Sequence, residues 1–470
     1  MLHALCRILL ANENKNARGQ RDKIEEENGR AEINAKTHEA INNQENRDQN
    51  HADVSIRFHD VTLLNRPSTD NPNLGSGIHQ THVRCWTFYV RRPPRRSLGE
   101  GGFDVSALFP ESALVTRDSS PIYWLVLTID ACEETWPLDK PFRISRGTRT
   151  ETRVVVVTLT DGQHSGRGEG VPIKRYNQAP ASVLAEIESV KSAPNLHREQ
   201  LQRLLPPGAA RNAVDCALWD LEAKISGKRA WELADFVKVR CSRHPVGDEH
   251  ASHSEPATES EVETSFTISL DTPEAMATAA KAVPNLPILK LKLGGDEGDL
   301  GRVKAVRETA PKARLLVDAN ESWTPDHYQR VVPFLAEFGI ELIEQPFPTD
   351  ADDILKTLDH PIPVCADESC HTTADLSGLK NRYEAINIKL DKTGGLTEAL
   401  FLVERACQAG FKLLIGCMVC TSLGIAPARL LAGAADWIDL DGALLLSRDR
   451  EHGLAYEDGK IGLPSRQLWG

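Results

Sequence analysis

Eight short apolar runs recur along the second half of the chain at nearly equal spacing. Each run carries a polar residue or a glycine at or near its end, and successive ends are 22 to 27 residues apart. A buried strand followed by a loop and a returning helix fits this spacing. Eight such units predict a parallel barrel whose reactive groups lie at the carboxyl ends of its strands. The residues at these ends are Thr267, Lys292, Asp318, Glu344, Asp367, Lys389, Gly416 and Asp439.

The chain ahead of the barrel has a different pattern. Apolar residues in YWLVLTIDACEETWPL and TRVVVVTLTDGQHSGRGEG predict antiparallel strands with a turn at Asp161 and Gly162. The segments ASVLAEIESVKS and ARNAVDCALWDLEAKISG predict helices, the second of which ends at Gly227. The packing face of this second helix is expected to consist of Val214, Ala217, Leu218, Leu221 and Ile225.

These patterns divide the chain into three parts. Residues 12–51 are rich in Asn, Glu, Arg and Gln, and the next segment carries Pro, Arg and Ser clusters, so burial cannot offset the entropy of ordering them. A start codon placed too far upstream would give the same pattern. We predict a largely disordered extension at 1–122, an α+β capping domain at 123–262 with a polar linker at 239–262 and a completing segment at 446–470, and a barrel at 263–445.

Composition narrows the class of protein. The chain of 470 residues has a formal net charge of −12, which argues against nucleic acid as its partner. No apolar run reaches the roughly eighteen residues of a membrane span, and the apolar start LHALCRILLA lacks a basic leader. The single CxxC, Cys417 and Cys420, has no second pair to complete a zinc site, so we interpret these residues as structural thiols. We therefore predict a cytoplasmic protein without a membrane partner.

Three carboxylates stand at the ends of adjacent predicted strands. Asp318, Glu344 and Asp367 would converge on one point of the barrel rim. A single acid at such a position is more often a helix cap, but three acids in register are typical of a cation site. Three oxygen ligands without His or Cys suit a hard cation, so the sequence predicts Mg²⁺.

Two lysines alternate with leucines in the run ILKLKL. Lys290 and Lys292 would share one face of a strand and the leucines the other. In an antiparallel sheet this pattern would indicate a solvated face. In a barrel the leucines must pack against the helices, so both lysines point inward, where an unpaired charge is costly. Lys389 ends a strand four positions further round, which places a second base across the barrel from Lys292.

This combination of groups suits one kind of reaction. A divalent ion that takes a substrate carboxylate stabilises the enediolate formed when one lysine removes the α-proton. The opposite lysine can then return a proton to the other face of the carbon. The outcome is epimerisation or racemisation by two-base 1,1-proton transfer. With a leaving group at the β-carbon, the same site would serve a lyase.

The motifs of the chain resemble a known family. KLKLGG, VDANESW, LIEQPFP, ADESCHT, NIKLDKTGGLTEA, GCMVCTS and DLDG are similar to the muconate-lactonizing subgroup of the enolase superfamily, and most closely to its L-Ala-D/L-Glu epimerases of murein peptide metabolism. WPLDKPFRISRGTRTE and GAARNAVDCALWDLEAK resemble the capping domain of that family. The resemblance runs from about residue 123 to residue 470. It implies an α/β fold of the enolase type, a modified TIM barrel (β/α)7β with an α+β cap.

The resemblance also implies the catalytic groups. Lys292 and Lys389 would be the acid/base pair, and Asp318, Glu344 and Asp367 would hold Mg²⁺. The substrate would be a small dipeptide. Formation of a homo-oligomer is left open.

Five further residues match substrate-binding positions of the family. Lys290 would bind the substrate carboxylate, while Asp439 and Asp441 would bind the free amino group of the dipeptide, a pairing of opposite charges. Thr267 matches a threonine that contacts substrate, and Arg149 matches the residue that meets the glutamate side chain. Taken alone, the last four have plainer interpretations: a turn or cap for the DxD, a strand former for the threonine, and a solvated charge for the arginine.

Two features depart from the family pattern. Where the cap loop of the family commonly reads RYGE, this chain has Arg175, Tyr176, Asn177 and Gln178. Asn tolerates positive φ better than most residues, so the turn is expected to persist while its contacts change. The linker at 239–262 is also longer than in the family.

Other functions stay open. An N-succinylamino acid racemase or an o-succinylbenzoate synthase shares the lysines and the metal but has no need of Asp439 and Asp441 to bind an amine. Activity on N-acylated amino acids and none on free dipeptides would favour that interpretation. A non-catalytic binding protein would have no use for the buried charges, and absence of any α-proton exchange would favour it.

Overall fold

The computed structural model describes residues 127–234 and 261–470, together with strands β1 (Asp53–Leu64) and β2 (Gln80–Arg91). β1 and β2 pair antiparallel with each other. The sequence pattern did not indicate this pair, which falls within the predicted extension. The rest of that extension and nearly all of the predicted linker lie outside the described residues, so those expectations stay predictions.

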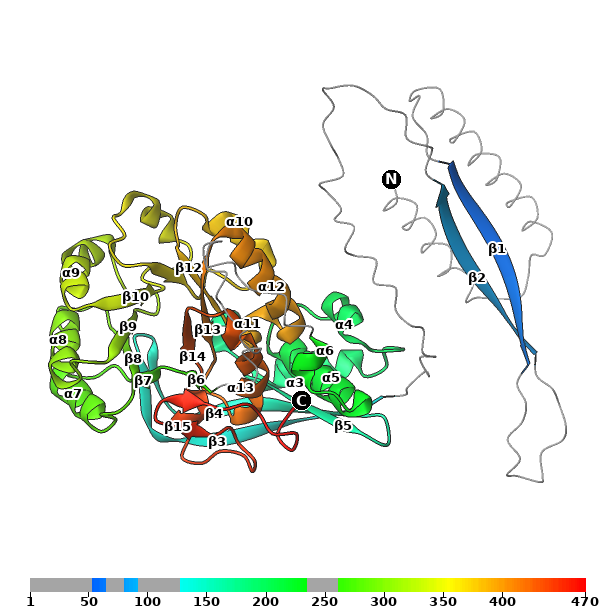
Figure 1. Ribbon diagram of the computed structural model, residues 1–470, viewed down its shortest axis with the longest axis horizontal. Helices are drawn as coiled ribbons and strands as arrows, with labels where there is room; N and C mark the ends of the chain where they lie inside the picture. Colours follow the sequence, from blue (N-terminus) through cyan, green and yellow to red (C-terminus); the bar gives the residue numbers. More distant parts are fainter. Residues whose placement is uncertain (1–52, 65–79, 92–126, 235–260) are drawn as a thin grey trace, which may run out of the picture. The chain divides into compact units, whose positions relative to one another are not determined.

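Eight parallel strands form a barrel, as the spacing of the apolar runs predicts (Figure 1). Strands that follow one another in sequence are neighbours in the sheet throughout. Ser265 N donates to Ile438 O (2.8 Å), which joins the first strand region to the last. The strands are β7 (Phe266–Ile268), β8 (Ile288–Lys292), β9 (Arg314–Asp318), β10 (Ile340–Glu344), β11 (Val364–Ala366), β12 (Ala385–Ile388), β13 (Lys412–Gly416) and β14 (Trp437–Asp439).

Helices connect the barrel strands on the outside. α9 starts where Thr324 Oγ1 accepts the backbone N–H of His327, with Pro325 as the first helical residue. Within the described ranges, none of the helices combines the length and the apolar character that crossing a membrane requires. The barrel helices are α7 (Pro273–Lys281), α8 (Asp299–Thr309), α9 (Pro325–Glu337), α10 (Leu376–Leu379), α11 (Leu390–Thr393), α12 (Leu396–Ala409) and α13 (Ser422–Arg429), and a 3₁₀ helix (Asp352–Thr357) follows β10.

The two faces of the barrel strands carry different side chains. Leu289, Leu291 and Leu293 are buried in the core between strands and helices, so the alternating Lys290 and Lys292 point to the barrel interior, where both are buried. Seven apolar side chains, one from each of seven strands, form a separate cluster inside the barrel. The polar residues at the carboxyl ends of these strands follow this apolar cluster along the strand. Its members are Ile288, Leu316, Leu342, Cys365, Ala385, Leu414 and Trp437.

An antiparallel sheet and four helices form the cap. β5 (Ser165–Gly170) allows a helix to approach closely, because a Cβ atom at Gly168 would lie 2.1 Å from Ala213 O. The helix it contacts, α5 (Ala209–Ser226), ends at Gly227 (φ +69°), as predicted. One member of the predicted face is wrong, since Ile225 is 41% exposed near the end of the helix. The other elements are β3 (Thr128–Ile144), β4 (Gly147–Thr160), α3 (Pro180–Val190), α4 (Arg198–Leu204) and α6 (Ala230–Leu233).

The end of the chain contacts the cap. Trp469 is fully buried and donates from Nε1 to Cys216 O (3.0 Å), and Gly470 N donates to Asp220 Oδ1 (2.7 Å). Both acceptors lie in α5. A small sheet formed by β6 (Val262–Glu263), β15 (Tyr456–Glu457) and β16 (Lys460–Ile461) precedes these contacts.

A buried seam joins the cap to the barrel beside Lys389 in the sequence. Asp391 Oδ1 accepts hydrogen bonds from Val171 N and Asn212 Nδ2, both at 2.8 Å. Arg211 in α5 donates to the backbone oxygen of Thr393 (2.6 Å). The seam therefore fixes the turn that follows β12 against the cap.

The stability of this seam is expected to depend on pH. Burial raises the pKa of Asp391 to about 7. Between roughly pH 4 and 7 the unfolded chain has released a proton that the folded protein retains, so the contribution of Asp391 to stability is full at low pH and is lost as pH rises. Asp391→Asn keeps an acceptor oxygen but does not titrate. The melting temperature of the wild type minus that of the variant should therefore fall from pH 4.5 to 7.5, and a constant difference would contradict this assignment.

Candidate active site

The predicted site residues gather at one end of the barrel. Eight of the ten line a single cavity of about 100 Å³ between the barrel and the cap. The other two, Asp318 and Glu344, are not part of that lining but form ion pairs with Lys290, which is. The eight are Arg149, Thr267, Lys290, Lys292, Asp367, Lys389, Asp439 and Asp441.

Lys290 lies among three carboxylates. Its Nζ is 2.6 Å from Glu344 Oε2, 2.7 Å from Asp439 Oδ2 and 3.4 Å from Asp318 Oδ2. Lys292 Nζ is 2.5 Å from Asp318 Oδ2. All five side chains are buried, so each charge depends on its neighbours for compensation.

Two residues that the sequence reasoning missed complete the cluster. The first is Lys392, whose Nζ is 2.6 Å from Asp367 Oδ1, while the predicted Lys389 has its Nζ 2.8 Å from Asp367 Oδ2. The second is Asn387. Asn387 Nδ2 donates to Glu344 Oε1 (2.8 Å). Both had a usable signal, because Asn387 precedes Lys389 by two residues on one strand face and Lys392 follows it by three residues in a helical turn.

Burial and charge act against each other in this cluster. Burial alone would raise the pKa of Asp318, but the ammonium groups of Lys292 and Lys290 hold it below its usual range. Burial would lower the pKa of Lys389, but the neighbouring carboxylate of Asp367 raises it well above its usual value. With its pKa raised in this way, Lys389 retains its proton more tightly than a free lysine does. It can act as a base once positive charge from elsewhere neutralises Asp367.

The carboxylates fit a hard divalent cation. Asp318, Glu344 and Asp367 end or directly follow three adjacent strands and are all buried. Ammonium groups stand where a cation would be attracted: Lys290 contacts Asp318 and Glu344, and Lys389 Nζ lies 3.7 Å from Glu344 and 2.8 Å from Asp367. Among the described residues, no three acidic, His or Cys side chains are placed close enough to share one ion as they stand. An oxygen-only donor set of this kind suits Mg²⁺.

Lysines face each other across the cavity. Lys292 belongs to β8, and Lys389 follows β12, four strands further round an eight-stranded barrel. Both side chains line the same cavity. A carbon atom bound between them would present one face to each ammonium or amine group.

A pair of acids lies at another wall of the cavity. Asp439 Oδ1 accepts a hydrogen bond from Ser265 Oγ (2.6 Å), and Asp441 Oδ2 accepts one from Thr267 N (2.6 Å). Burial, and then the charge of Asp439, raise the pKa of Asp441 to about 6. Asp439 pairs with Lys290, whereas Asp441 has no ion-pair partner in the described part of the chain. This wall therefore has a negative charge to offer a cationic group.

The cap supplies arginines to the cavity. Arg146 already forms ion pairs, with Glu368 at 2.7 Å and with Glu321 at 3.1 Å. Arg149 in β4 lines the cavity and has no ion-pair partner among the residues described. Burial, and then the charge of Arg146, lower its pKa. Arg149 is thus placed to meet an anionic group of a ligand.

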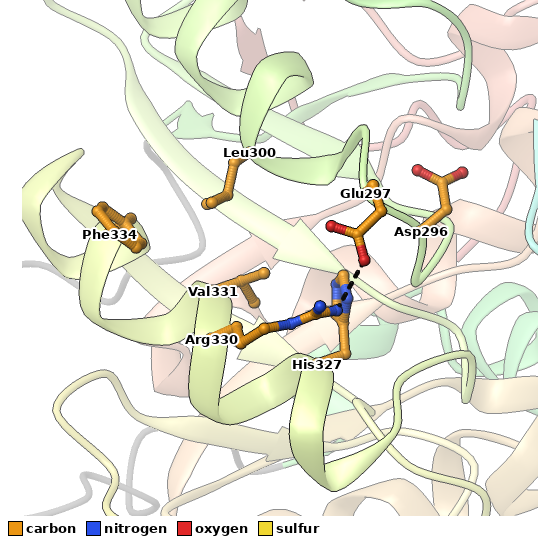
Figure 2. A pocket seen from close by; sticks show the side chains of 7 residues that line it. All are labelled: Asp296, Glu297, Leu300, His327, Arg330, Val331 and Phe334. Carbon is orange, nitrogen blue, oxygen red and sulfur yellow. Dashed lines mark ion pairs between the residues drawn. The ribbon is translucent and has the colours of Figure 1, made fainter.

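A larger cavity, of about 410 Å³, lies outside the barrel between α8 and α9 (Figure 2). An ion pair between Glu297 and Arg330 (3.0 Å) crosses it. His327 Nε2 is 3.1 Å from buried Asp299 Oδ2, and Asp299 also accepts two backbone N–H groups from the loop after β8. This cavity contains none of the predicted site residues, and its contacts hold the loop after β8 in place, so the smaller cavity stays the candidate active site.

Two family models match the chain. The one described as "Mandelate racemase / muconate lactonizing enzyme, N-terminal domain" matches residues 126–234, and "Enolase C-terminal domain-like" matches residues 274–467. The chain belongs to this family of the enolase superfamily. The matched regions are the cap and the barrel, whose contact encloses the site.

Two members of the family that resemble the chain are isomerases by name. The chain is 43% identical over 341 residues to the L-Ala-D/L-Glu epimerase of Escherichia coli (strain K12). This match covers 72% of this chain and 99% of the relative. It is 39% identical over 322 residues to the N-acetyl-D-glutamate racemase of Pseudoalteromonas sp, covering 67% of this chain and 95% of the relative. This family member is therefore an isomerase.

Solved structures of the family share the fold. An enolase family member from Agrobacterium tumefaciens with homology to dipeptide epimerases, with bound sodium and L-Ala-L-Glu, is 46% identical, with a TM-score of 0.67 over 73% of this chain and 100% of that chain. The dipeptide epimerase from Enterococcus faecalis V583 complexed with Mg and L-Leu-L-Tyr is 29% identical, with a TM-score of 0.63 over 72% of this chain and 96% of that chain. The predicted enolase-type fold is confirmed.

Proposed function

We propose that this isomerase epimerises dipeptides of the L-Ala-D/L-Glu type at the α-carbon of the C-terminal residue. The observation that carries the proposal is one cavity with Lys292 and Lys389 on opposite strands and Asp439 and Asp441 on its wall. Opposed lysines suit proton transfer on both faces of one carbon, and the acids suit a free amino group. The relative from Escherichia coli supports the same substrate class.

We infer that Asp318, Glu344 and Asp367 hold Mg²⁺. When bound there, Mg²⁺ would withdraw electron density from the substrate carboxylate and so make the α-proton easier to remove. The buried oxygen-only donor set supports this inference. The Enterococcus faecalis structure with Mg supports it independently.

The chain's own residues then have separate tasks. Lys290 contributes positive charge for the substrate carboxylate, and Arg149 does so for an acidic side chain of the C-terminal residue. Lys292 removes or returns the α-proton on one face, and Lys389 does so on the other. The acids at the cavity wall fix the amino end, so the α-carbon is held between the lysines. A cytoplasmic location and the oligomeric state stay predictions.

A second candidate is racemisation of N-acylated amino acids, which the 39% identical N-acetyl-D-glutamate racemase favours. An N-acyl substrate has no ammonium group, so it would gain nothing from Asp441. Asp441→Asn keeps an acceptor for Thr267 N and removes the charge. If dipeptides are the substrates, this variant should lose about 10- to 100-fold in kcat/KM for L-Ala-L-Glu, as expected for a lost charged hydrogen bond.

N-acetyl-L-glutamate provides the matched comparison, measured by the same α-proton exchange. The dipeptide proposal expects wild type to prefer L-Ala-L-Glu and the variant to lose that preference. Two results together would establish the second candidate instead. The wild type would exchange N-acetyl-L-glutamate faster than L-Ala-L-Glu, and Asp441→Asn would change the rate for neither compound.

A further inference from the structure

One barrel residue holds two loops of the cap. Glu321 accepts a bidentate contact from Arg175, with Nε to Oε2 and Nη2 to Oε1 both at 2.8 Å. Arg146 Nη1 contacts the same carboxylate at 3.1 Å, and Thr349 N donates to it at 3.2 Å. The Glu321 side chain is only 8% exposed. Planar, two-pronged contacts of this kind are the strong form of ion pair.

The backbone around Glu321 is held in an uncommon conformation. Asn320 has φ +45° and Glu321 has φ +67°, both in the left-handed region that non-glycine residues seldom adopt. Glu321 N donates to Gln345 O (2.9 Å), which fixes this turn to the strand end that carries Glu344. Arg146 Nη1 also donates to Asn320 O (2.9 Å). Left-handed residues at a cavity rim are typical of functional positions.

The loops that Glu321 holds form the roof of the cavity. Arg146 lies at the turn between β3 and β4, and Arg175 and Tyr176 lie in the segment that reads RYNQ in this chain. All three line the cavity. The predicted turn of that segment is confirmed, since Asn177 has φ +59°. Tyr176 also packs edge-on against His371 of the barrel, with ring centroids 4.6 Å apart.

The roof leaves little space beneath it. The cavity has a volume of about 100 Å³, whereas pockets for small ligands usually measure about 300 to 1,000 Å³. A substrate therefore needs the roof to move outward on entry and return over the bound molecule. The contacts of Glu321 are the ones that the two roof loops share.

We propose that Glu321 is a positioning residue that fastens both roof loops over the cavity and so sets how tightly the enzyme retains its substrate. It acts through Arg175 and Arg146 and does not touch the substrate, because it is not part of the cavity lining. The proposal rests on the proposed function only for the choice of substrate.

The test compares Glu321→Gln with a matched control, Glu222→Gln, in the full chain. Glu222 on α5 makes the same kind of bidentate contact with Arg198 on α4, at 2.9 and 3.0 Å to Nε and 2.9 Å to Nη2. Like Glu321, Glu222 does not line the cavity. Glu321→Gln should raise KM for L-Ala-L-Glu about tenfold, the order expected for lost charged hydrogen bonds, while kcat changes less than about threefold because the lysines are untouched. The control should leave both values unchanged.

Hydrogen exchange without any substrate supplies the second measurement. Backbone amides of residues 143–149 and 173–178 should exchange several-fold faster in Glu321→Gln than in wild type or in the control. Faster exchange together with the KM effect supports the proposal. Unchanged exchange in these segments, or unchanged KM, overturns it. If wild type converted no dipeptide, the proposed function would fail, and the exchange comparison alone would decide whether Glu321 fastens the loops.

Discussion

Lys389→Ala should lower the interconversion of L-Ala-L-Glu and L-Ala-D-Glu by about a thousandfold, the order that a positioned general acid or base contributes. Lys389 and Lys292 lie on opposite strands of one cavity, so each is expected to serve one face of the α-carbon. Removing one lysine leaves no group to complete the transfer on its side. Exchange of the α-proton with solvent should survive for one diastereomer only, because Lys292 can still remove that proton.

The measurement is the appearance of the second diastereomer and the loss of the α-proton signal, followed separately for each starting peptide. Lys304→Ala is a suitable control, because this lysine is 63% exposed on α8 and lines neither of the cavities described above. Lys292→Ala should retain α-proton exchange only for the diastereomer that loses it in Lys389→Ala. Equal loss of exchange for both diastereomers in both variants would contradict the two-base assignment.

Glu344→Gln should weaken Mg²⁺ binding by about 100-fold or more, since even residues that only orient metal ligands are worth about 10- to 100-fold. Glu344 is the middle of the three carboxylates, and it shares Lys290 with Asp318 and approaches Lys389 together with Asp367. A neutral amide removes one of the hard anionic ligands. Binding can be measured by calorimetry with Mg²⁺, or by electron paramagnetic resonance with Mn²⁺ as a probe.

The control for this change is Glu384→Gln at the opposite end of the barrel. Glu384 precedes β12, is 43% exposed and pairs with His360 (2.9 Å). It therefore cannot contact a metal ion at the carboxyl ends of the strands. The control should bind Mg²⁺ as the wild type does. Unchanged affinity in Glu344→Gln would remove this residue from the metal site and weaken the inference for the other two carboxylates.

The barrel and its rim could be predicted because their pattern is local and periodic. A parallel barrel repeats one strand and one return at nearly constant spacing, and alternation within a strand decides which side chains face inward. This is why Lys290 and Lys292 are inside while the neighbouring leucines pack against helices. The same alternation would have indicated Asn387, which lies two residues before Lys389.

The contacts between cap and barrel could not be predicted in the same way. Arg146, Arg175 and Glu321 are separated by up to 175 residues along the chain, and none of them belongs to a periodic pattern. Their meeting depends on how two loops turn and on a left-handed backbone at Asn320 and Glu321. For the departure at RYNQ, the sequence predicted that the turn persists but not what Arg175 would bind.

The central proposal is that one cavity with two opposed lysines moves a proton on and off the α-carbon of a dipeptide. The most direct test is proton NMR of L-Ala-L-Glu and L-Ala-D-Glu, incubated separately in D₂O with the full chain and Mg²⁺. We predict loss of the glutamate α-proton signal and formation of the other diastereomer from either starting peptide. Absence of exchange from both peptides, in protein shown to be folded and loaded with Mg²⁺, would contradict it.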